Sequence, residues 1–283
     1  MAVVAVVFDF DDTLVPDSTS ALLSAHGIDS GTFWTEDAKR LVDEGYDPPL
    51  AYLKLLLDRV GDGCPLGRLT NADLRMFGAT LDSTFFPGIP QIFDDLRTEV
   101  ATYRDISIEF YIVSGGLEEV ILGSSVVAQH FDGVYGCQFG EDESTGEVRH
   151  VKRCVTFTEK TRFLFEIHKG ISAEDSKTQP HLVNEFIKEE ARRVPFEQMI
   201  YVGDGLTDVP CFSLVNKNNG VTFGVFQRGH ESAKQAFQRF LATDRVKSLY
   251  SPDYREDADL GAMLRAAVAS TATRVALQGH RPV

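Results

Sequence analysis

The chain has 283 residues, of which 43% are hydrophobic and 25% charged, and its formal net charge is −14. This composition is typical of a globular protein and excludes an intrinsically disordered chain, while the length predicts one core domain and a smaller accessory domain. The negative charge argues against nucleic acid or an anionic membrane as a partner, because the chain would repel their phosphate groups. A small phosphorylated metabolite stays compatible with it, since one local cation can dominate the field of a site.

The sequence shows no membrane segment and no metal-binding pattern of cysteine or histidine. No apolar run approaches the ~20 residues that cross a bilayer. The apolar residues 1–8 lack a basic segment and end at Asp9, too soon for a secretory signal peptide. The four cysteines and seven histidines are scattered, which predicts reduced and mostly buried thiols. We therefore expect a cytoplasmic protein, and the sequence does not indicate its oligomeric state.

The first predicted element is a strand at residues 2–8 (AVVAVVF), which is apolar on both faces and typical of a buried strand in a parallel sheet. Asp9 follows it directly, and Asp11 comes two residues later, so both side chains would point to the same side. A carboxylate at the end of a buried strand costs free energy unless something compensates it. The carboxyl ends of parallel strands are also where ligands bind in α/β proteins. These acids therefore predict a functional site at this edge of the sheet.

The next part of the chain has helical patterning and no convincing strand. Residues 51–60 (AYLKLLLDRV) are amphipathic at helical spacing, and two prolines stand just before them, where a helix start tolerates proline. Residues 86–90 (FPGIP) are typical of a turn and would return the chain to the core. We therefore predict a helical cap domain at residues 16–85, inserted into a core domain formed by residues 1–15 plus 86–283.

Beyond the cap, a helix at residues 91–97 leads to a strand at residues 106–113 (ISIEFYIV). Ser114 and Gly115 follow it at a predicted strand-to-helix junction. A hydroxyl group and glycine amides at such a junction suit an oxyanion such as phosphate. Residues 131–157 then predict a small β-hairpin around a polar turn.

The last core segments repeat the combination of a buried strand and carboxylates. A strand at residues 199–202 (MIYV) ends in a tight glycine turn that carries Asp204 and Asp208. The remaining predicted elements are helices at residues 161–168 and 181–193, a strand at residues 221–226 and, after residue 269, a mobile tail or a peripheral helix. Strands that alternate with helices predict an α/β fold with a doubly wound, mainly parallel, Rossmann-like sheet.

Together these residues predict a site for Mg²⁺ and a phosphoryl group. Carboxylates are hard oxygen ligands, which suit Mg²⁺ rather than zinc. A cluster of carboxylates repels itself, and Mg²⁺ with one lysine, Lys160 at the start of a predicted helix, would offset that charge. A carboxylate can accept a phosphoryl group once the phosphorus is held in line with it.

Four motifs in chain order resemble those of the haloacid dehalogenase (HAD) superfamily. Residues 9–13 (DFDDT) resemble its first motif, DxDxT, and Ser114 resembles the second, a serine or threonine that ends a core strand. Lys160 resembles the third motif, and residues 203–208 (GDGLTD) resemble the fourth, GDxxxD. The motifs span most of the chain. The first motif alone would be moderately specific, whereas four motifs in order, each placed by a strand or a helix, are highly specific.

The resemblance implies a role for each matching residue. Asp9 resembles the nucleophile that forms an aspartyl-phosphate, and Asp11 resembles the general acid for the leaving alcohol and then the base for the attacking water. By the same analogy Mg²⁺ would be held by Asp9, the backbone carbonyl of Asp11 and Asp204, with Asp208 supporting the metal ligands. The groups that would bind the phosphoryl oxygens belong to Thr13, Ser114, Gly115 and Lys160.

The helical insertion resembles the first type of HAD cap, as in the phosphoserine phosphatase-like branch. Dehalogenases lack the second aspartate, so Asp11 argues against dehalogenation, and Phe10 stands where transport ATPases carry a lysine. One departure concerns the acid and the arginine that phosphoserine-specific members place in the cap. This chain has no clear equivalent, and Asp17, Glu36 and Arg40 are the candidates.

We therefore predict a Mg²⁺-dependent phosphatase that hydrolyses a small phosphomonoester through an aspartyl-phosphate on Asp9. A phosphomutase or phosphotransferase with the same intermediate is the first alternative, and a non-catalytic phosphate-binding regulator is the second. The sequence does not name the substrate, because cap residues set it and follow no readable code. In the cap, Phe33 and Trp34 fit either the wall of a substrate pocket or the core of the cap itself.

Overall fold

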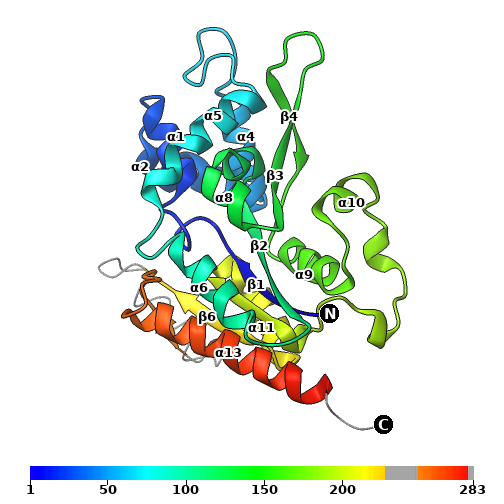
Figure 1. Ribbon diagram of the computed structural model, residues 1–283. Coiled ribbons are helices and arrows are strands. Elements are labelled where there is room, and N and C mark those ends of the chain that lie inside the picture. The colour runs from blue at the N-terminus through cyan, green and yellow to red at the C-terminus, as the bar shows by residue number, and fades with distance from the viewer. Residues whose placement is uncertain (227–245, 247, 280–283) are drawn as a thin grey trace.

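The computed structural model of the protein describes residues 1–226, 246 and 248–279. Within these residues a seven-stranded sheet runs in the order β4-β3-β2-β1-β5-β6-β7, with helices on its faces and a helical cap beyond one end (Figure 1). Neighbouring strands are parallel except for β3 and β4. The strands are β1 (Ala2–Phe8), β2 (Ile106–Leu117), β3 (Gly133–Glu141), β4 (Val148–Arg153), β5 (Met199–Gly203), β6 (Val221–Val225) and β7 (Leu249–Tyr250).

The α-helices of the described chain are α1 (Ser18–Ala25), α2 (Ser30–Thr32), α3 (Lys39–Asp43), α4 (Pro48–Leu57), α5 (Asn71–Thr80), α6 (Gln91–Val100), α7 (Glu118–Gly123), α8 (Ser125–His130), α9 (Glu159–Lys169), α10 (Ala173–Thr178), α11 (Val209–Lys217) and α13 (Asp259–Gly279). A π-helical segment, Phe33–Ala38, joins α2 to α3. Short 3₁₀ turns lie at Leu81–Thr84, Leu182–Asn184, Glu189–Ala191, Phe196–Gln198 and Leu206–Asp208. None of the described helices combines the length and the hydropathy that crossing a bilayer requires.

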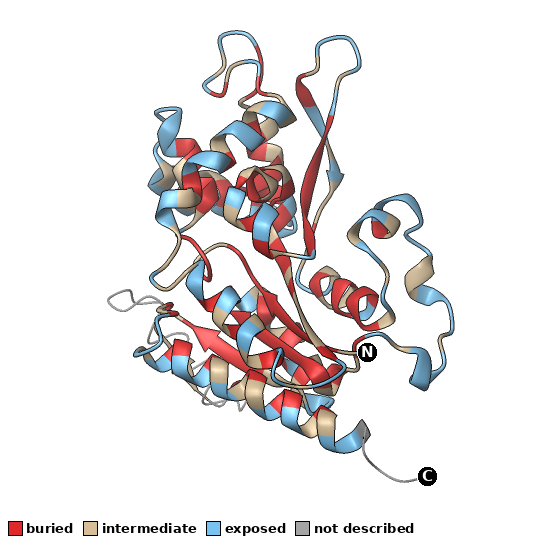
Figure 2. Cartoon of the chain, viewed as in Figure 1, coloured by how far each residue is buried: buried red, intermediate tan, exposed pale blue. Residues whose placement is uncertain are grey.

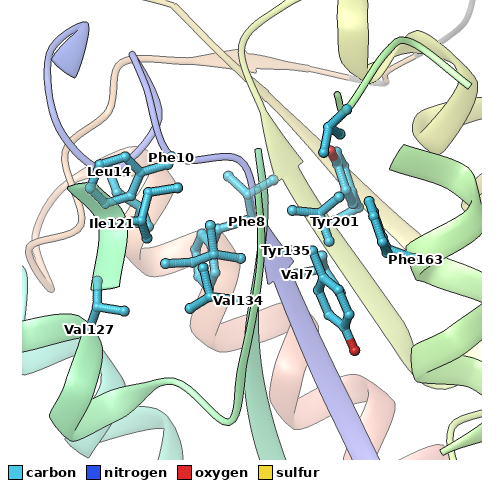
Figure 3. Close-up of a cluster of buried hydrophobic side chains, with 14 of the residues drawn as sticks. Val7, Phe8, Phe10, Leu14, Ile121, Val127, Val134, Tyr135, Phe163 and Tyr201 are labelled. Atoms are coloured by element: carbon cyan, nitrogen blue, oxygen red, sulfur yellow. The ribbon is translucent and has the colours of Figure 1, made fainter. Parts of the chain in front are cut away.

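Strand β1 is the centre of the fold, because it pairs with β2 on one side and with β5 on the other. Side chains alternate along a strand, so Val7 and Phe8 point to opposite faces of the sheet. Figure 3 shows Val7 grouped with Tyr135 and Tyr201, and Phe8 beside Val134. Helix α6 packs on the Phe8 face and α9 on the Val7 face, while the outer sides of the helices stay exposed (Figure 2). This arrangement confirms the predicted doubly wound, mainly parallel α/β sheet.

The chain between β1 and α6 is described throughout and contains helices but no strand, as the sequence predicts. Helix α4 begins at Pro48, where the missing N–H of proline costs nothing because the first turn lacks intrahelical acceptors. Six of its residues are buried, and all are apolar except Tyr52, which carries a hydroxyl group. The π-helical turn at Phe33–Ala38 has no signature in the sequence pattern and was not predicted. Residues 227–245, 247 and 280–283, which belong to the predicted core domain, lie outside the described residues.

Two glycines bring the cap helix α5 into backbone contact with α7 of the core. A Cβ atom on Gly78 would lie 2.0 Å from the carbonyl oxygen of Val120, and one on Gly123 would lie 2.1 Å from that of Arg75. Real Cβ atoms do not approach an oxygen this closely, so only glycine allows the two helices to cross at this distance. The two helices are therefore in main-chain contact at this crossing, and the ion pair between Arg75 and Glu119 joins them beside it.

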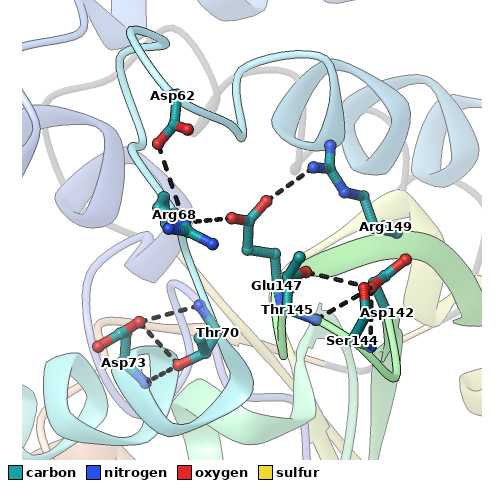
Figure 4. A network of polar contacts seen from close by, with 9 residues as sticks. All are labelled: Asp62, Arg68, Thr70, Asp73, Asp142, Ser144, Thr145, Glu147 and Arg149. Carbon is teal, nitrogen blue, oxygen red and sulfur yellow. Dashed lines mark hydrogen bonds and ion pairs between the residues drawn. The ribbon is translucent and has the colours of Figure 1, made fainter.

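The cap is also joined to the β3–β4 hairpin by an ion-pair network (Figure 4). Arg68 Nε lies 2.5 Å from Glu147 Oε1, and Arg149 Nη2 lies 2.7 Å from Glu147 Oε2. The buried Glu147 carboxylate thus has a cation on each side. Next to it, the Val148 N–H donates to the Leu69 carbonyl oxygen at 2.9 Å. The hairpin predicted at residues 131–157 is present, and it packs against the cap.

The helix predicted at residues 181–193 is wrong. The segment contains only the 3₁₀ turns Leu182–Asn184 and Glu189–Ala191, and none of its residues is buried. Phe186, its largest apolar side chain, is 87% exposed. Without an apolar face that packs against the core, a helix of this length is not stable in water.

The structure corrects two further expectations about element boundaries. Ser114 does not end its strand, since β2 continues to Leu117 with a register irregularity between Val113 and Leu117. The C-terminal helix α13 begins well before residue 269 and contacts α6, β1 and β2, so it is part of the core rather than a peripheral addition.

We expect Gly78→Ala to lower the free energy of unfolding by roughly 1–3 kcal/mol, because the new methyl group forces α5 away from α7. Alanine is otherwise the better helix former by about 1 kcal/mol. The matched control is Gly31→Ala in α2, where the nearest atom to a new Cβ lies at 3.4 Å. Urea unfolding of both variants checks the prediction, which a Gly78→Ala protein as stable as the wild type would contradict.

Candidate active site

The predicted site residues meet where the carboxyl ends of β1, β2 and β5 come together. Asp9 directly follows β1, and its N–H donates to the Val202 carbonyl oxygen of β5 at 2.9 Å. This bond continues the sheet pairing by one residue and fixes the backbone that carries the carboxylate. Ser114 lies in β2 on the other side, and Asp204 follows β5. Three neighbouring strands therefore deliver a carboxylate, a hydroxyl group and a second carboxylate to one place.

Lys160 lies in the interior of this site between two carboxylates. Its Nζ is 2.8 Å from Asp9 Oδ2 and 2.7 Å from Asp208 Oδ1, and its side chain is 1% exposed. Asp208 also accepts hydrogen bonds from the Tyr201 hydroxyl at 2.6 Å and from the Gly205 N–H at 2.9 Å. Helix α9 supplies the lysine from its first turn. The lysine thus offsets two buried negative charges and orients Asp9.

The electrostatics of the site follow from this burial. Burial lowers the pKa of Lys160, but Asp208 and Asp9 raise it more, so the pKa lies above its usual value and the lysine stays charged. Burial raises the pKa of Asp9 to about 6, although Lys160 acts against the shift. Burial, followed by the charges of Asp9 and Asp208, also raises the pKa of Asp204 well above its usual value. A single lysine therefore leaves this carboxylate cluster short of positive charge.

The carboxylates offer a set of oxygen donors that fits Mg²⁺. Asp9, Asp204 and Asp208 each have an oxygen within a group whose members all lie within 4.8 Å of one another. Both oxygens of Asp9 and both oxygens of Asp208 already contact donors within the protein, but Asp208 does not line the cavity. Asp9 and Asp204 are therefore the members of the group that face the space where a metal could bind. Carboxylate oxygens are the donors that Mg²⁺ prefers in proteins.

Asp11 is held at the junction between core and cap. Its Oδ1 accepts a hydrogen bond from the Ser18 N–H at 2.7 Å, at the start of α1. Burial raises the pKa of this carboxyl group to about 8, and the charge of nearby Asp17 adds to the shift. A Cβ on Gly116 would lie 2.6 Å from Asp11 Oδ2, so glycine at this position lets Asp11 approach β2. The Asp11 side chain therefore lies at the edge of the site and lines the same cavity as Asp9.

A cavity of about 280 Å³ opens onto these groups. The residues that line it are Asp9, Asp11, Asp12, Asp17, Thr19, Trp34, Tyr52, Ser114, Gly115, Gly116, Asp204, Gly205, Leu206 and Thr207. A larger groove of about 990 Å³ lies between α9 and the segment near Phe186, and none of the predicted site residues lines it. The smaller cavity is the one that the predicted site residues line.

Three predicted residues do not line the cavity. Lys160 lies behind Asp9 and contacts it, and Asp208 contacts the same lysine. Thr13 is fully buried, and its hydroxyl oxygen has no hydrogen-bond partner. Its carbonyl oxygen accepts a hydrogen bond from the Tyr254 hydroxyl at 2.8 Å, which ties the first motif to the C-terminal part of the chain.

The cap contributes residues to the cavity that motif matching did not assign. Tyr52 of α4 donates its hydroxyl to the Gly115 carbonyl oxygen at 2.5 Å. Its position in an amphipathic helix predicts only that it is buried, and the partner from β2 could not be read from the sequence. Trp34, left open between a cavity wall and the cap core, lines the cavity. Asp12 also lines it, in the left-handed backbone conformation at φ 53°.

We expect Lys160→Met to lower the free energy of unfolding by roughly 3–5 kcal/mol, because it leaves two buried carboxylates without their cation. Lys54→Met is the control, since Lys54 forms an exposed pair with Asp58 that contributes no more than about 1 kcal/mol. Urea unfolding without divalent ions measures both. Similar losses in the two variants would contradict the role of Lys160 as the central counter-charge.

Comparison with known proteins supports the fold. No protein-family model matches the chain. An uncharacterised protein of Borreliella burgdorferi is 29% identical over 275 residues, covering 88% of this chain and 92% of that protein. The structure of a gene product of Archaeoglobus fulgidus is 13% identical, and the match covers 96% of this chain and 85% of that protein with a TM-score of 0.49. A HAD family hydrolase of Salmonella enterica subsp. enterica serovar Typhi is 12% identical, covers 88% of this chain and 67% of its own, and has a TM-score of 0.57. The match to the Salmonella hydrolase shows that the chain has the fold of a HAD family hydrolase.

Proposed function

We propose that the protein is a Mg²⁺-dependent phosphatase that hydrolyses a small phosphomonoester through an aspartyl-phosphate on Asp9. The observation that carries the proposal is the placement of Asp9, which is paired with the buried Lys160, lies beside Asp204 and opens onto a cavity that Asp11 also lines. The four motifs that resemble the HAD superfamily and the HAD fold support the same assignment. Residues 16–85 would then be the cap over the site.

In the first step one oxygen of Asp9 attacks the phosphorus of the ester. The bond from Asp9 to phosphorus forms while the bond from phosphorus to the alcohol oxygen breaks, and Asp11 gives its proton to that oxygen. Lys160 holds Asp9 in place by their 2.8 Å contact. Ser114 and Gly115 line the same cavity and lie where they can contact the phosphoryl oxygens.

In the second step water hydrolyses the aspartyl-phosphate. Asp11 takes a proton from the water, the water oxygen bonds to phosphorus, and the bond from phosphorus to Asp9 breaks, which releases phosphate. The same carboxyl group can serve in both steps because the first leaves it ionised. Its contact with the Ser18 N–H keeps it close to the cap, on the side from which the alcohol would leave.

The metal would be held by Asp9, Asp204 and the backbone carbonyl of Asp11, with Asp208 fixing the turn and the lysine behind them. Bound there, Mg²⁺ would supply positive charge that offsets the carboxylates and the phosphoryl oxygens. Asp208 contributes through Lys160 and through the Gly205 N–H rather than as a free ligand.

We expect Asp9→Asn to reduce phosphate release by roughly 10⁴-fold or more, because the amide is no nucleophile toward phosphorus. Asp58→Asn, on the exposed side of the cap, is the control and should keep wild-type activity. A panel of phosphomonoesters without any acceptor is the assay, with circular dichroism to show that both variants are folded. Activity retained in Asp9→Asn would contradict the assignment, and transfer of phosphate only to an added acceptor would favour a phosphotransferase.

We expect EDTA to abolish activity and Mg²⁺ to restore it, because the carboxylate cluster lacks sufficient positive charge without a metal. A second readout is thermal unfolding, in which Mg²⁺ should raise the Tm of the wild type. The rise should be smaller in Asp204→Asn, which lacks one of the proposed ligands. Turnover that persists in EDTA, or an equal rise in Tm in the variant, would argue against the metal site.

A further inference from the structure

The charge on the cavity wall restricts what the leaving alcohol can carry. Five carboxyl groups line the cavity, those of Asp9, Asp11, Asp12, Asp17 and Asp204. No lysine, arginine or histidine is among the described residues that line it, and Lys160 lies behind Asp9, already paired with two carboxylates. A carboxylate or a second phosphate on the alcohol would therefore enter a negative field without a cation to pair with it.

Two aromatic rings of the cap stand in the same cavity. Trp34 and Tyr52 both line it, with ring centroids 5.7 Å apart and ring planes inclined by 55°. Aromatic faces carry partial negative charge and attract cations, tryptophan more strongly than other rings. Inclined rings with a carboxylate nearby form a corner that suits an ammonium group. We call Asp17, Trp34 and Tyr52 the aromatic corner.

The aromatic corner is fixed by hydrogen bonds within the protein. The Trp34 indole N–H donates to Ser20 Oγ at 2.9 Å, and Ser20 Oγ donates to Asp17 Oδ2 at 2.5 Å. The Tyr52 hydroxyl is bound to the Gly115 carbonyl oxygen. One serine therefore sets the carboxylate and the indole relative to each other before any ligand arrives, which reduces the entropy that binding would cost.

The local backbone supports a functional reading of Trp34. It lies in the π-helical segment Phe33–Ala38, and π-helical turns occur frequently at functional sites because they interrupt the regular spacing of side chains. The neighbouring Phe33 is 1% exposed and forms the packed side of the segment. Trp34 is only partly buried: it packs against the hydrophobic core, donates its indole N–H to Ser20 of α1 and also lines the cavity.

The aromatic corner lies on the leaving-group side of the proposed reaction. Asp17 directly precedes Ser18, whose N–H binds Asp11, the proposed acid for the alcohol. At about 280 Å³ the cavity is small for a ligand site, which favours a short alcohol. We propose that the substrate is a phosphomonoester of a short alcohol that bears an ammonium group, held by Asp17, Trp34 and Tyr52. The inference rests on the proposed phosphatase activity and names its substrate class.

The test compares substrates that differ only in charge. Choline phosphate is matched with 3,3-dimethylbutyl phosphate, in which carbon replaces the nitrogen, and with phosphoglycolate as the anionic ester. We expect kcat/KM for choline phosphate to exceed that of the neutral isostere by about tenfold or more, from cation–π and charge contacts. Equal or better turnover of the neutral or the anionic ester overturns the proposal.

A generic substrate separates this inference from the proposed function. If p-nitrophenyl phosphate is hydrolysed but choline phosphate has no advantage, the phosphatase assignment stands and the aromatic corner is wrong. If no ester is hydrolysed, the phosphatase assignment fails. Calorimetry then tests whether the aromatic corner binds an ammonium group, by comparing the binding of choline phosphate with that of its neutral isostere. Tighter binding of choline phosphate supports the corner, and equal binding overturns it.

Variants of the cap assign the preference to residues. In Asp17→Asn the side-chain oxygen can still cap α1, as Asp17 does for the Thr19 and Ser20 N–H groups, while the charge is lost. We expect it to reduce the ratio of choline phosphate to neutral isostere by about fivefold, mainly through KM, and Trp34→Leu to do the same. The matched control is Asp29→Asn, at the N-cap of α2 and outside the cavity, where the ratio should stay unchanged. An unaltered ratio in both Asp17→Asn and Trp34→Leu overturns the assignment.

Discussion

The pairing of Lys160 with Asp9 and Asp208 is the interaction on which the site depends. Asp9 and Asp208 are held in the interior by different strands, and without a cation between them their mutual repulsion would oppose the folding of the sheet. The lysine comes from the first turn of α9, and this helix packs against β2 and α11 on the Val7 face of the sheet. The ion pairs therefore link the packing of the core to the orientation of the Asp9 carboxylate, and a change in one changes the other.

Much of the core follows from local sequence. Strand β1 is apolar on both faces and is succeeded by an acid, and this combination alone predicts a buried central strand with a site at its end. The short strand β5 with its glycine turn repeats the signal. The segment at residues 181–193 shows the limit of the method, because helical patterning does not say whether a face has anything to pack against. The extension of β2 past Ser114 was equally hidden, since its pairing with β3 is decided by a partner that lies far along the chain.

The residues of the candidate site also fall into those that the sequence predicts and those that only the structure places. Motifs indicate which core residues meet, and the structure brings Asp9, Asp11, Ser114 and Asp204 to one cavity. The burial of Thr13 and the place of Lys160 behind Asp9 depend on depth in the fold, which spacing does not encode. The cap side is harder still, because Tyr52 reaches the cavity through a contact with β2 and Trp34 through an irregular turn of helix. The proposed substrate contacts of the cap arise from tertiary packing, whereas Asp9 and Asp204 directly follow the ends of strands.

The backbone contact between α5 and α7 has a consequence for how ligands exchange. The cap is fastened there through Gly78 and Gly123, and again at the hairpin through Arg68 and Glu147. A rigid-body swing of the cap would have to break both attachments at once. Helix α1 and the π-helical segment share neither of them, yet they carry part of the cavity wall. Any movement that admits a ligand would therefore fall to these short segments, and the hydrogen bonds that join Asp17, Ser20 and Trp34 would make them move as one unit while the rest of the cap stays in place.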